Sequence, residues 1–197
     1  DQDNVYLKPN HLNFSEAAAL PLAGLTAYRA IFDRGELDSS NRVLITGIGG
    51  GAATFALKFA LAAGAEVYVT SGDDNKILKA KELGALGGVN YKYQNWEEEL
   101  SKLRSGFDVI IDSAAGEGFS RLVNLANPGG RIVLFGRTAG TIPLLDPKII
   151  FWKQLSIHGS TMGSDEEFKQ MYGNAKSCWK NYSRDDTASL QKARSFF

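Results

Sequence analysis

The stretch RVLITGIGGGA, residues 42–52, decides the fold of this chain. An apolar run from Val43 to Ile45 stops at a glycine cluster, and an alanine-rich segment then continues from Ala52 to Ala63. This order predicts a strand, a tight turn and a helix. Such a unit binds pyrophosphate, because the free N–H groups at the helix start and the positive end of its dipole face the anion.

Each small residue of the stretch has its own role in this interpretation. Gly47 permits the turn, since a residue without a Cβ tolerates positive φ. Gly49 leaves room for the phosphates of a dinucleotide against the backbone, and Ala52 is the small third member of the G-x-G-x-x-G/A pattern. The candidate pyrophosphate-binding residues are Gly47, Gly49, Gly50, Gly51 and Ala52.

The composition excludes several partner classes. Among 197 residues, 22 Lys plus Arg balance 22 Asp plus Glu, so the net charge gives no reason to expect nucleic acid or an anionic membrane surface. One cysteine, Cys178, excludes an internal disulfide and a cysteine cluster for zinc. The sequence has no apolar run that could span a bilayer and no signal-peptide pattern at its acidic start. We therefore expect a cytoplasmic protein without a membrane partner.

Strand-like and helix-like segments alternate after residue 41. This alternation predicts an α/β fold, a Rossmann-type, doubly wound, parallel six-stranded sheet in the order 3-2-1-4-5-6 with helices on both faces. The expected strands are 43–46, 66–70, 89–91, 107–112, 131–135 and 155–159, and the expected helices are 52–63, 73–83, 96–104, 119–125 and 147–152.

The two ends of the chain differ from the alternating part. Residues 1–40 are expected to form a helical lead-in that adds no strand, with one apolar helix over Ser15–Phe32 that Ser15 caps. Residues 41–172 form the expected dinucleotide-binding domain. Residues 173–197 are polar and weakly periodic, which indicates a partly mobile tail.

A resemblance to a known family rests on segments in a fixed order and spacing. They are AAALPLAGLTAYRAI (17–31), the glycine stretch, KAKELGALGGVNY (79–91), and FDVIIDSAAGEGF with PGGRIVLFGRTAG (107–119 and 128–140). Together they resemble the zinc-independent, quinone-oxidoreductase-like branch of the medium-chain dehydrogenase/reductase superfamily. Members combine a GroES-like catalytic domain with a nucleotide-binding Rossmann domain. The chain resembles the second domain only, so we expect it to be a fragment or an isolated domain.

The resemblance also bears on zinc. Zinc-dependent alcohol dehydrogenases of the superfamily place a cysteine ligand four residues before the threonine that matches Thr26, and this position is Leu22 here. His11 and His158 have no acidic or cysteine partner at ligand spacing, and surface or capping roles explain them better. We therefore expect no metal site, although further ligands would lie in the catalytic domain.

The end of the second strand indicates which dinucleotide is bound. NAD-specific sites need an acid there for the ribose 2′-hydroxyl, and the resemblance places Ser71 at this position. Asp73 and Asp74 are rival candidates, but we interpret them as the start of the next helix, where carboxylates offset the dipole. Ser71 leaves room for a 2′-phosphate, and the resemblance implies Lys76 and Tyr91 as its partners. NADPH is thus expected over NADH. The alternatives are a solvated helix lysine for Lys76 and a packing residue at the sheet edge for Tyr91.

The rest of the cleft follows from topology, because ligands bind beyond the carboxyl ends of the strands, between the first and fourth. The resemblance implies that the nicotinamide half binds beside the loop after the fifth strand. Arg137 in that loop is interpreted as solvated, and Tyr28 as a core aromatic residue. The remaining candidates, each of which could instead belong only to a small loop or turn, are Thr26, Ser113, Ala114, Phe135, Gly136 and Ser160.

The resemblance implies an oxidoreductase in which NADPH delivers a hydride to a quinone, an enone or a related carbonyl-conjugated substrate. No Ser-His-Asp, Cys-His or paired-carboxylate arrangement is present in the sequence, so we assign no catalytic residue. The chain alone is expected to bind the cofactor with little turnover. Two alternatives stay open. One is an NADPH-binding, sensing or assembly module without enzymatic activity. The other is an S-adenosylmethionine methyltransferase, which would need an acid where Ser71 lies.

The sixth strand indicates that the chain has a second copy of itself as a partner. It is the last strand in the expected order, so one edge of it has no neighbour within the domain, and it carries Leu155 and Ile157. Members of the resembled family commonly pair this edge with a second subunit. We therefore expect a homodimer through the edge of the sixth strand.

Overall fold

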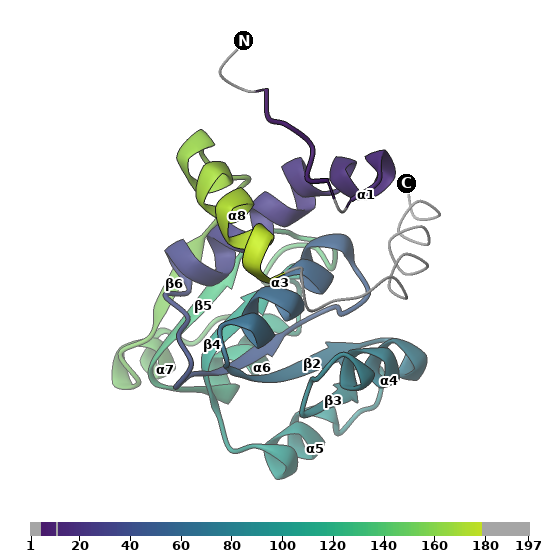
Figure 1. Cartoon of the computed structure of the whole chain (residues 1–197). Coiled ribbons are helices and arrows are strands. Elements are labelled where there is room, and N and C mark those ends of the chain that lie inside the picture. Colours follow the sequence, from purple (N-terminus) through teal and green to yellow (C-terminus); the bar gives the residue numbers. More distant parts are fainter. Residues whose placement is uncertain (1–4, 11, 179–197) are drawn as a thin grey trace.

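The strands form where the apolar runs of the sequence lie. The computed structural model describes residues 5–10 and 12–178. Six parallel strands form one sheet in the order β3-β2-β1-β4-β5-β6 (Figure 1), which confirms the predicted 3-2-1-4-5-6 arrangement. The strands are β1 (Arg42–Ile45), β2 (Glu66–Ser71), β3 (Gly87–Asn90), β4 (Phe107–Asp112), β5 (Ala126–Leu134) and β6 (Ser156–Gly159).

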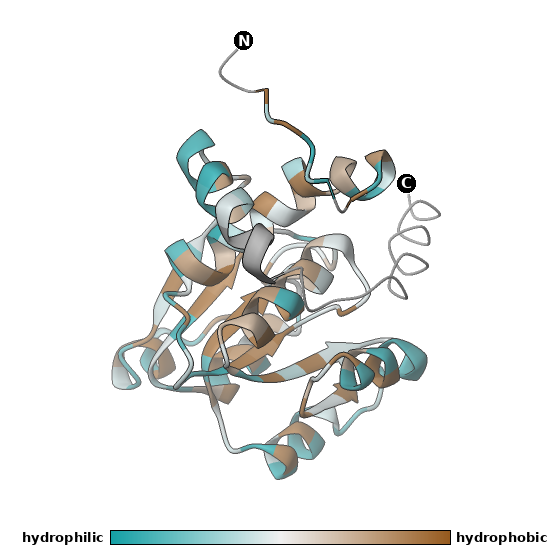
Figure 2. Cartoon of the chain, in the orientation of Figure 1, coloured by the Kyte–Doolittle hydropathy of each residue, from teal (hydrophilic) through white to brown (hydrophobic). Residues whose placement is uncertain are grey.

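Helices cover both faces of the sheet, as predicted. Neighbouring residues of β1 point to opposite faces, so Val43 and Ile45 join one apolar cluster and Leu44 joins the other. Figure 2 shows hydrophobic residues along the strands and hydrophilic residues on the outer sides of α4 and α5. The helices are α1 (Phe14–Ala18), α2 (Leu25–Tyr28), α3 (Gly51–Ala62), α4 (Asp74–Glu82), α5 (Trp96–Leu103), α6 (Phe119–Leu125), α7 (Pro147–Trp152) and α8 (Asp165–Cys178), with π-helical turns η2 (Leu20–Gly24) and η3 (Arg29–Arg34).

The lead-in differs from the single capped helix that we expected. Helix α1 begins at Phe14, and its N-cap is Asn13 rather than Ser15. The Asn13 side chain accepts a hydrogen bond from the backbone N–H of Glu16 at 2.9 Å, and the Glu16 carboxylate accepts one from the Asn13 N–H at 2.7 Å. This reciprocal pair needs an acid three residues after the cap, and only Asn13 has one. Further along, the lead-in alternates between π-helical and α-helical turns.

Strand β5 and helix α8 also extend beyond their expected limits. Strand β5 begins at Ala126 rather than Arg131, because Ala126 pairs with Phe107 before an irregularity in the register. Helix α8 runs through the boundary expected between residues 172 and 173 and lies across the lead-in (Figure 1). The remaining helices and strands of the sheet domain agree with the predicted limits within two residues. His11 and the part of the predicted tail after residue 178 lie outside the described residues.

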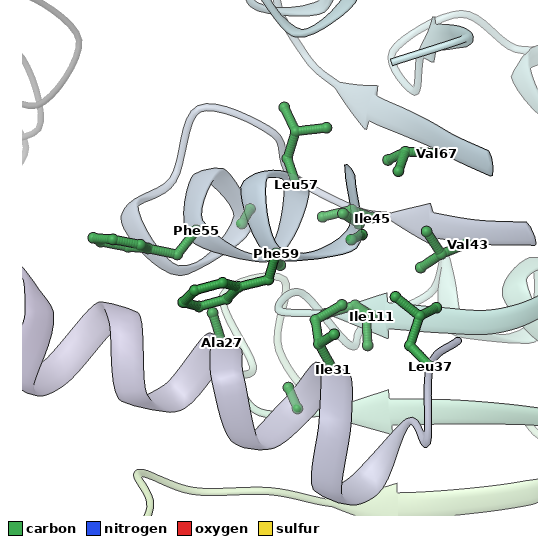
Figure 3. Packing of buried hydrophobic residues seen from close by; sticks show 14 of the residues in the cluster. Ala27, Ile31, Leu37, Val43, Ile45, Phe55, Leu57, Phe59, Val67 and Ile111 are labelled. Carbon is green, nitrogen blue, oxygen red and sulfur yellow. The ribbon is translucent and has the colours of Figure 1, made fainter. Parts of the chain in front are cut away.

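The lead-in is part of the main hydrophobic core. Figure 3 shows Ala27 and Ile31 directed toward Phe59 of α3 and toward the strand residues beneath it. Ile31 is completely buried. Gly35, at the end of the lead-in, lies so close to the sheet that a Cβ on it would be 3.1 Å from the Val109 side chain. The lead-in therefore packs directly on α3 and the sheet, which positions the start of α3.

We predict that Ile31→Ala lowers the free energy of unfolding by about 2–5 kcal/mol, because it opens a cavity between the lead-in and the sheet. Leu22→Ala is the matched control, since Leu22 lies on the same lead-in with 55% of its surface exposed. It should change the free energy of unfolding by less than about 0.5 kcal/mol. Urea denaturation of both variants measures the difference, and equal losses would contradict the role given to Ile31.

Candidate cofactor site

The glycine turn between β1 and α3 has the geometry that the sequence predicted. Gly47 has φ 64° and Gly49 has φ 102°, both in the region that favours glycine. Gly50 is the N-cap of the twelve-residue helix α3, and no side-chain hydrogen bond caps this helix. The start of α3 thus combines a bare backbone with the positive end of a helix dipole, which is the arrangement that binds phosphate groups.

Lys76 lies across this turn. A Cβ placed on Gly49 would lie 2.5 Å from Cδ and 3.1 Å from Cε of Lys76, so the lysine stem occupies the space that glycine leaves. Lys76 comes from the first turns of α4, which follows β2, and is half-buried. The predicted phosphate ligand and the predicted phosphate turn are therefore in contact.

Ser71 ends β2, as the sequence indicated, but its hydroxyl faces the protein. The residue is only 3% exposed. Its Oγ donates a hydrogen bond to the carbonyl of Ile48 at 3.2 Å and accepts one from the N–H of Asp73 at 3.3 Å. Ser71 therefore fastens the glycine turn to the end of β2. Ser71 would therefore affect phosphate binding only indirectly, because its small side chain leaves space for the 2′-phosphate.

The two acids that follow Ser71 belong to α4, which confirms their interpretation as the start of a helix. Asp73 is the N-cap and accepts a hydrogen bond from the N–H of Asn75 at 2.9 Å. Asp74 accepts hydrogen bonds from the Asn90 amide at 3.1 Å and from the Tyr93 hydroxyl at 3.0 Å. The bond to Asp74 raises the pKa of the Tyr93 hydroxyl above its ordinary value. Both carboxylates therefore already have hydrogen-bond partners within the protein.

Tyr91 and Lys92 close over the end of β2 from the other side. A Cβ placed on Gly72 would lie 2.9 Å from the Tyr91 hydroxyl oxygen and 2.9 Å from Cε of Lys92. The backbone N–H of Tyr91 also donates to the carbonyl of Ser71 at 3.0 Å. Lys92 is absent from the sequence prediction. Its position directly after Tyr91 was the available signal, but nothing in the local pattern separates it from other exposed lysines.

The loops after β4 and β5 lie beside the glycine turn. A Cβ on Gly47 would lie 3.3 Å from the Ser113 hydroxyl oxygen, and one on Gly136 would lie 2.5 Å from the Ser113 carbonyl oxygen. The N–H of Ala139 donates to the carbonyl of Ala114 at 2.9 Å. The structure therefore brings the predicted residues Ser113, Ala114 and Gly136 together beside the glycine turn. Half-buried Phe135 packs against the main core.

The remaining predicted residues lie on neighbouring elements. Thr26 is half-buried in α2, which packs against α3. The backbone N–H of Ser160 donates to the Leu134 carbonyl at 2.9 Å, and its buried Oγ has no hydrogen-bond partner among the described residues. Contact of these two residues with a cofactor stays a prediction. Tyr28 is buried against Phe32 and Phe59, which confirms it as a core residue, and Arg137 is exposed as expected.

Within the described part of the chain, no group of three or more His, Cys, Asp or Glu side chains is arranged to hold a metal ion. Leu22, at the position of the cysteine ligand in zinc-dependent relatives, is more than half exposed. A leucine has no atom that could bind zinc, so Leu22 itself is not a ligand. Over the same residues, no helix is long and apolar enough to cross a membrane.

The sheet order and the glycine turn are those of a nucleotide-binding domain of the dehydrogenase type. The sequence pattern of the family described as "Zinc-binding dehydrogenase" matches residues 51–177, and the chain belongs to this family. This finding confirms the resemblance to the medium-chain dehydrogenase/reductase superfamily. It also removes the methyltransferase alternative.

Two curated relatives show what kinds of protein the chain is similar to. It is 40% identical over 178 residues to the zinc-type alcohol dehydrogenase-like protein YogA of Leptosphaeria maculans, which covers 86% of the chain and 49% of the relative. It is 31% identical over 170 residues to the human quinone oxidoreductase, which covers 84% of the chain and 51% of the relative. The chain thus spans about half the length of these relatives.

Solved structures give the same result for the fold. An NAD-dependent alcohol dehydrogenase superimposes with a TM-score of 0.83 and 33% identity, over 90% of the chain and 52% of the other protein. The 2-octenoyl-CoA carboxylase reductase CinF was solved in complex with NADP and 2-octenoyl-CoA. It superimposes with a TM-score of 0.79 and 25% identity, over 86% of the chain and 43% of the other protein.

We predict that Gly49→Ala lowers the free energy of unfolding by about 1–3 kcal/mol, because an alanine is strained at φ 102° and displaces the Lys76 stem. Gly51→Ala is the control. It adds a Cβ within the first turn of α3, where the nearest atom is the Ala23 Cβ at 3.4 Å. This variant should stay within about 0.5 kcal/mol of the parent, since alanine favours a helix. Thermal or urea denaturation measures both, and equal tolerance would show that the turn accepts a side chain.

Proposed function

We propose that this chain is the cofactor-binding part of an NADPH-dependent, zinc-independent oxidoreductase that transfers a hydride to a quinone, an enone or a related carbonyl-conjugated acceptor. The observation that carries the proposal is the arrangement at the end of β2. Lys76 lies over Gly49, Tyr91 and Lys92 lie over Gly72, and Ser71 joins the two sides through Ile48.

The charges around this point favour a phosphate over a bare ribose. A 2′-phosphate is a dianion with strong acceptor oxygens, and two lysines and a phenol would supply donors to it. An NAD-specific site needs a carboxylate directed at the ribose. Here Asp73 caps α4, and Asp74 is bonded to Asn90 and Tyr93. The charged side chains that lie over Gly49 and Gly72 are therefore those of Lys76 and Lys92.

Each part of the crevice would have a different task in binding. The glycine turn and the start of α3 would hold the pyrophosphate, and the loops after β4 and β5 would orient the nicotinamide half. When bound, NADPH supplies the hydride, so this chain contributes position and electrostatics. The similarity to a quinone oxidoreductase supports the acceptor class, and we propose little turnover by the chain alone. A role in NADPH binding without enzymatic activity stays the alternative, and turnover of NADPH with a quinone by the full-length protein would decide it.

We predict that the chain binds NADPH more tightly than NADH, and that Lys76→Ala weakens NADPH by roughly 1.5–3 kcal/mol while sparing NADH. Lys92→Ala should weaken NADPH in the same selective manner but by less, because Lys92 is exposed and water screens its charge. Titrations followed by nicotinamide and tryptophan fluorescence give both affinities for each variant.

Lys79→Ala is the matched control for these titrations, since it removes an exposed lysine from the same helix α4 without approaching Gly49 or Gly72. It should leave both affinities unchanged. If Lys76→Ala weakened the two cofactors equally, the assignment of the 2′-phosphate would be wrong. If the parent bound neither dinucleotide, the whole proposal would fail.

We also propose that the assembly is a homodimer formed through β6. This strand is an edge of the sheet, and its side chains are largely exposed. Next to it, α7 presents Phe151 and Trp152, which are 63% and 72% exposed with ring centroids 5.8 Å apart. Among the described residues, no strand pairs with the outer edge of β6. Such an edge, together with the exposed aromatic rings of α7, fits a second copy of the same surface, because a two-fold axis lets each edge pair with the other.

We predict that Trp152→Lys and Ile157→Lys each shift the protein from dimer to monomer in size-exclusion chromatography with light scattering, because a desolvated charge would lie in the contact. Leu86→Lys places the same charge at an exposed leucine beside β3, at the opposite edge of the sheet, and should leave the mass unchanged. A monomeric parent, or a dimer that survives both β6-side changes, would contradict this assembly.

A further inference from the structure

A buried acid at the carboxyl end of β4 has no part in the function proposed so far. Asp112 is 1% exposed, and Thr46, which follows β1, is 6% exposed. One carboxylate oxygen of Asp112 accepts a hydrogen bond from the Thr46 hydroxyl at 2.6 Å, and the other accepts one from the backbone N–H of Ala115 at 2.8 Å. A buried carboxylate is retained only where such donors satisfy it.

The second of these bonds holds a strained residue. Ala115 has φ 55°, a left-handed conformation that a residue with a Cβ seldom adopts, and it is buried. A backbone in this region persists only when its surroundings fix it, and such positions cluster at functional sites. The Asp112 carboxylate binds the N–H of Ala115 itself and so stabilises this conformation.

The pair reaches three loops of the crevice. Thr46 immediately precedes Gly47, and its Oγ1 also accepts a hydrogen bond from the N–H of Ser113 at 3.4 Å. The main-chain carbonyl of Asp112 accepts one from the N–H of Phe135 at 3.1 Å. Asp112 therefore connects the entry to the glycine turn, the loop after β4 and the loop after β5.

We propose that Thr46 and Asp112 form a positioning pair that sets the distance between the glycine turn and the loop after β4, and so fixes the width of the dinucleotide crevice. Neither side chain needs to touch the cofactor. The proposal rests on the proposed function in one respect, that the dinucleotide binds between these loops. The chemistry requires a group with two acceptor oxygens and no donor at position 112, and a hydroxyl at position 46.

Two pairs of variants separate positioning from general stability. Thr46→Val removes the hydroxyl but keeps the branched shape, whereas Thr46→Ser keeps the hydroxyl. Asp112→Asn replaces one acceptor by a donor. Asp108→Asn makes the same change at the opposite end of β4, where Asp108 accepts hydrogen bonds from the Arg42 N–H and the Asn127 amide at 2.8 and 2.6 Å. Asp108 thus also bridges neighbouring strands, but at the opposite end from the crevice.

The first measurement is NADPH affinity by fluorescence titration. Thr46→Val and Asp112→Asn should weaken binding by about ten-fold, since an unsatisfied buried group lets the loops move apart. Thr46→Ser and Asp108→Asn should stay within about three-fold of the parent. Parental affinity in Thr46→Val, or an equal loss in Thr46→Ser, would overturn the pair. If Asp112→Asn fails to fold, the two Thr46 variants still decide.

The second measurement is amide hydrogen exchange in the chain without cofactor, which does not depend on the proposed function. Residues 47–49 and 113–116 should exchange faster in Thr46→Val and Asp112→Asn than in the parent and Asp108→Asn. Unchanged exchange in these loops would overturn the pair even if NADPH binds. If the parent binds no dinucleotide, the proposed function fails, and the exchange rates alone test the pair.

Discussion

The turn between β1 and α3 depends on two positions at which the backbone must be bare. Two of its residues, Gly47 and Gly49, adopt positive φ, and the space above Gly49 is filled by the stem of Lys76 rather than by a side chain of the turn. This requirement fixes what can surround the turn. A serine is small enough to end β2 against it, and Ser113 lies close to Gly47 on the other side.

Side chains around the turn divide into those that fix its shape and those that give it charge. Ser71 and Asp112 bind the turn and its neighbouring loops through buried hydrogen bonds, so their polar atoms are directed into the protein. Lys76, Lys92 and Tyr91 extend over the glycines from outside. Buried polar groups of the first kind set geometry because each must keep its partners, whereas half-buried and exposed cations set preference between ligands through long-range attraction.

Most element limits could be predicted from the sequence, because buried parallel strands are short apolar runs that alternate with helices. The sheet order was predicted from this alternation together with the glycine turn, which is typical of the order 3-2-1-4-5-6. The glycine roles and the helix-start role of Asp73 followed from backbone rules. The rest depended on contacts between distant segments. Thr46 and Asp112 are 66 residues apart, and Lys92 reaches Gly72 only because β3 lies beside β2. The Asn13 cap was missed although Glu16 follows it at the spacing of a capping box.

Two kinds of contact hold the elements around the proposed cofactor site. The lead-in packs on α3, and α8 packs on the lead-in, so the helix that would face the pyrophosphate is anchored by the main core. The loops after β4 and β5 are held by the hydrogen bond from Ala115 to the Asp112 carboxylate and by backbone bonds between them. The helix start is thus held by apolar packing, and the loops after β4 and β5 are held by polar contacts. If the dinucleotide binds as proposed, both the helix anchored by the core and the loops held by Thr46 and Asp112 would contribute to its affinity, because each is in place before the ligand arrives.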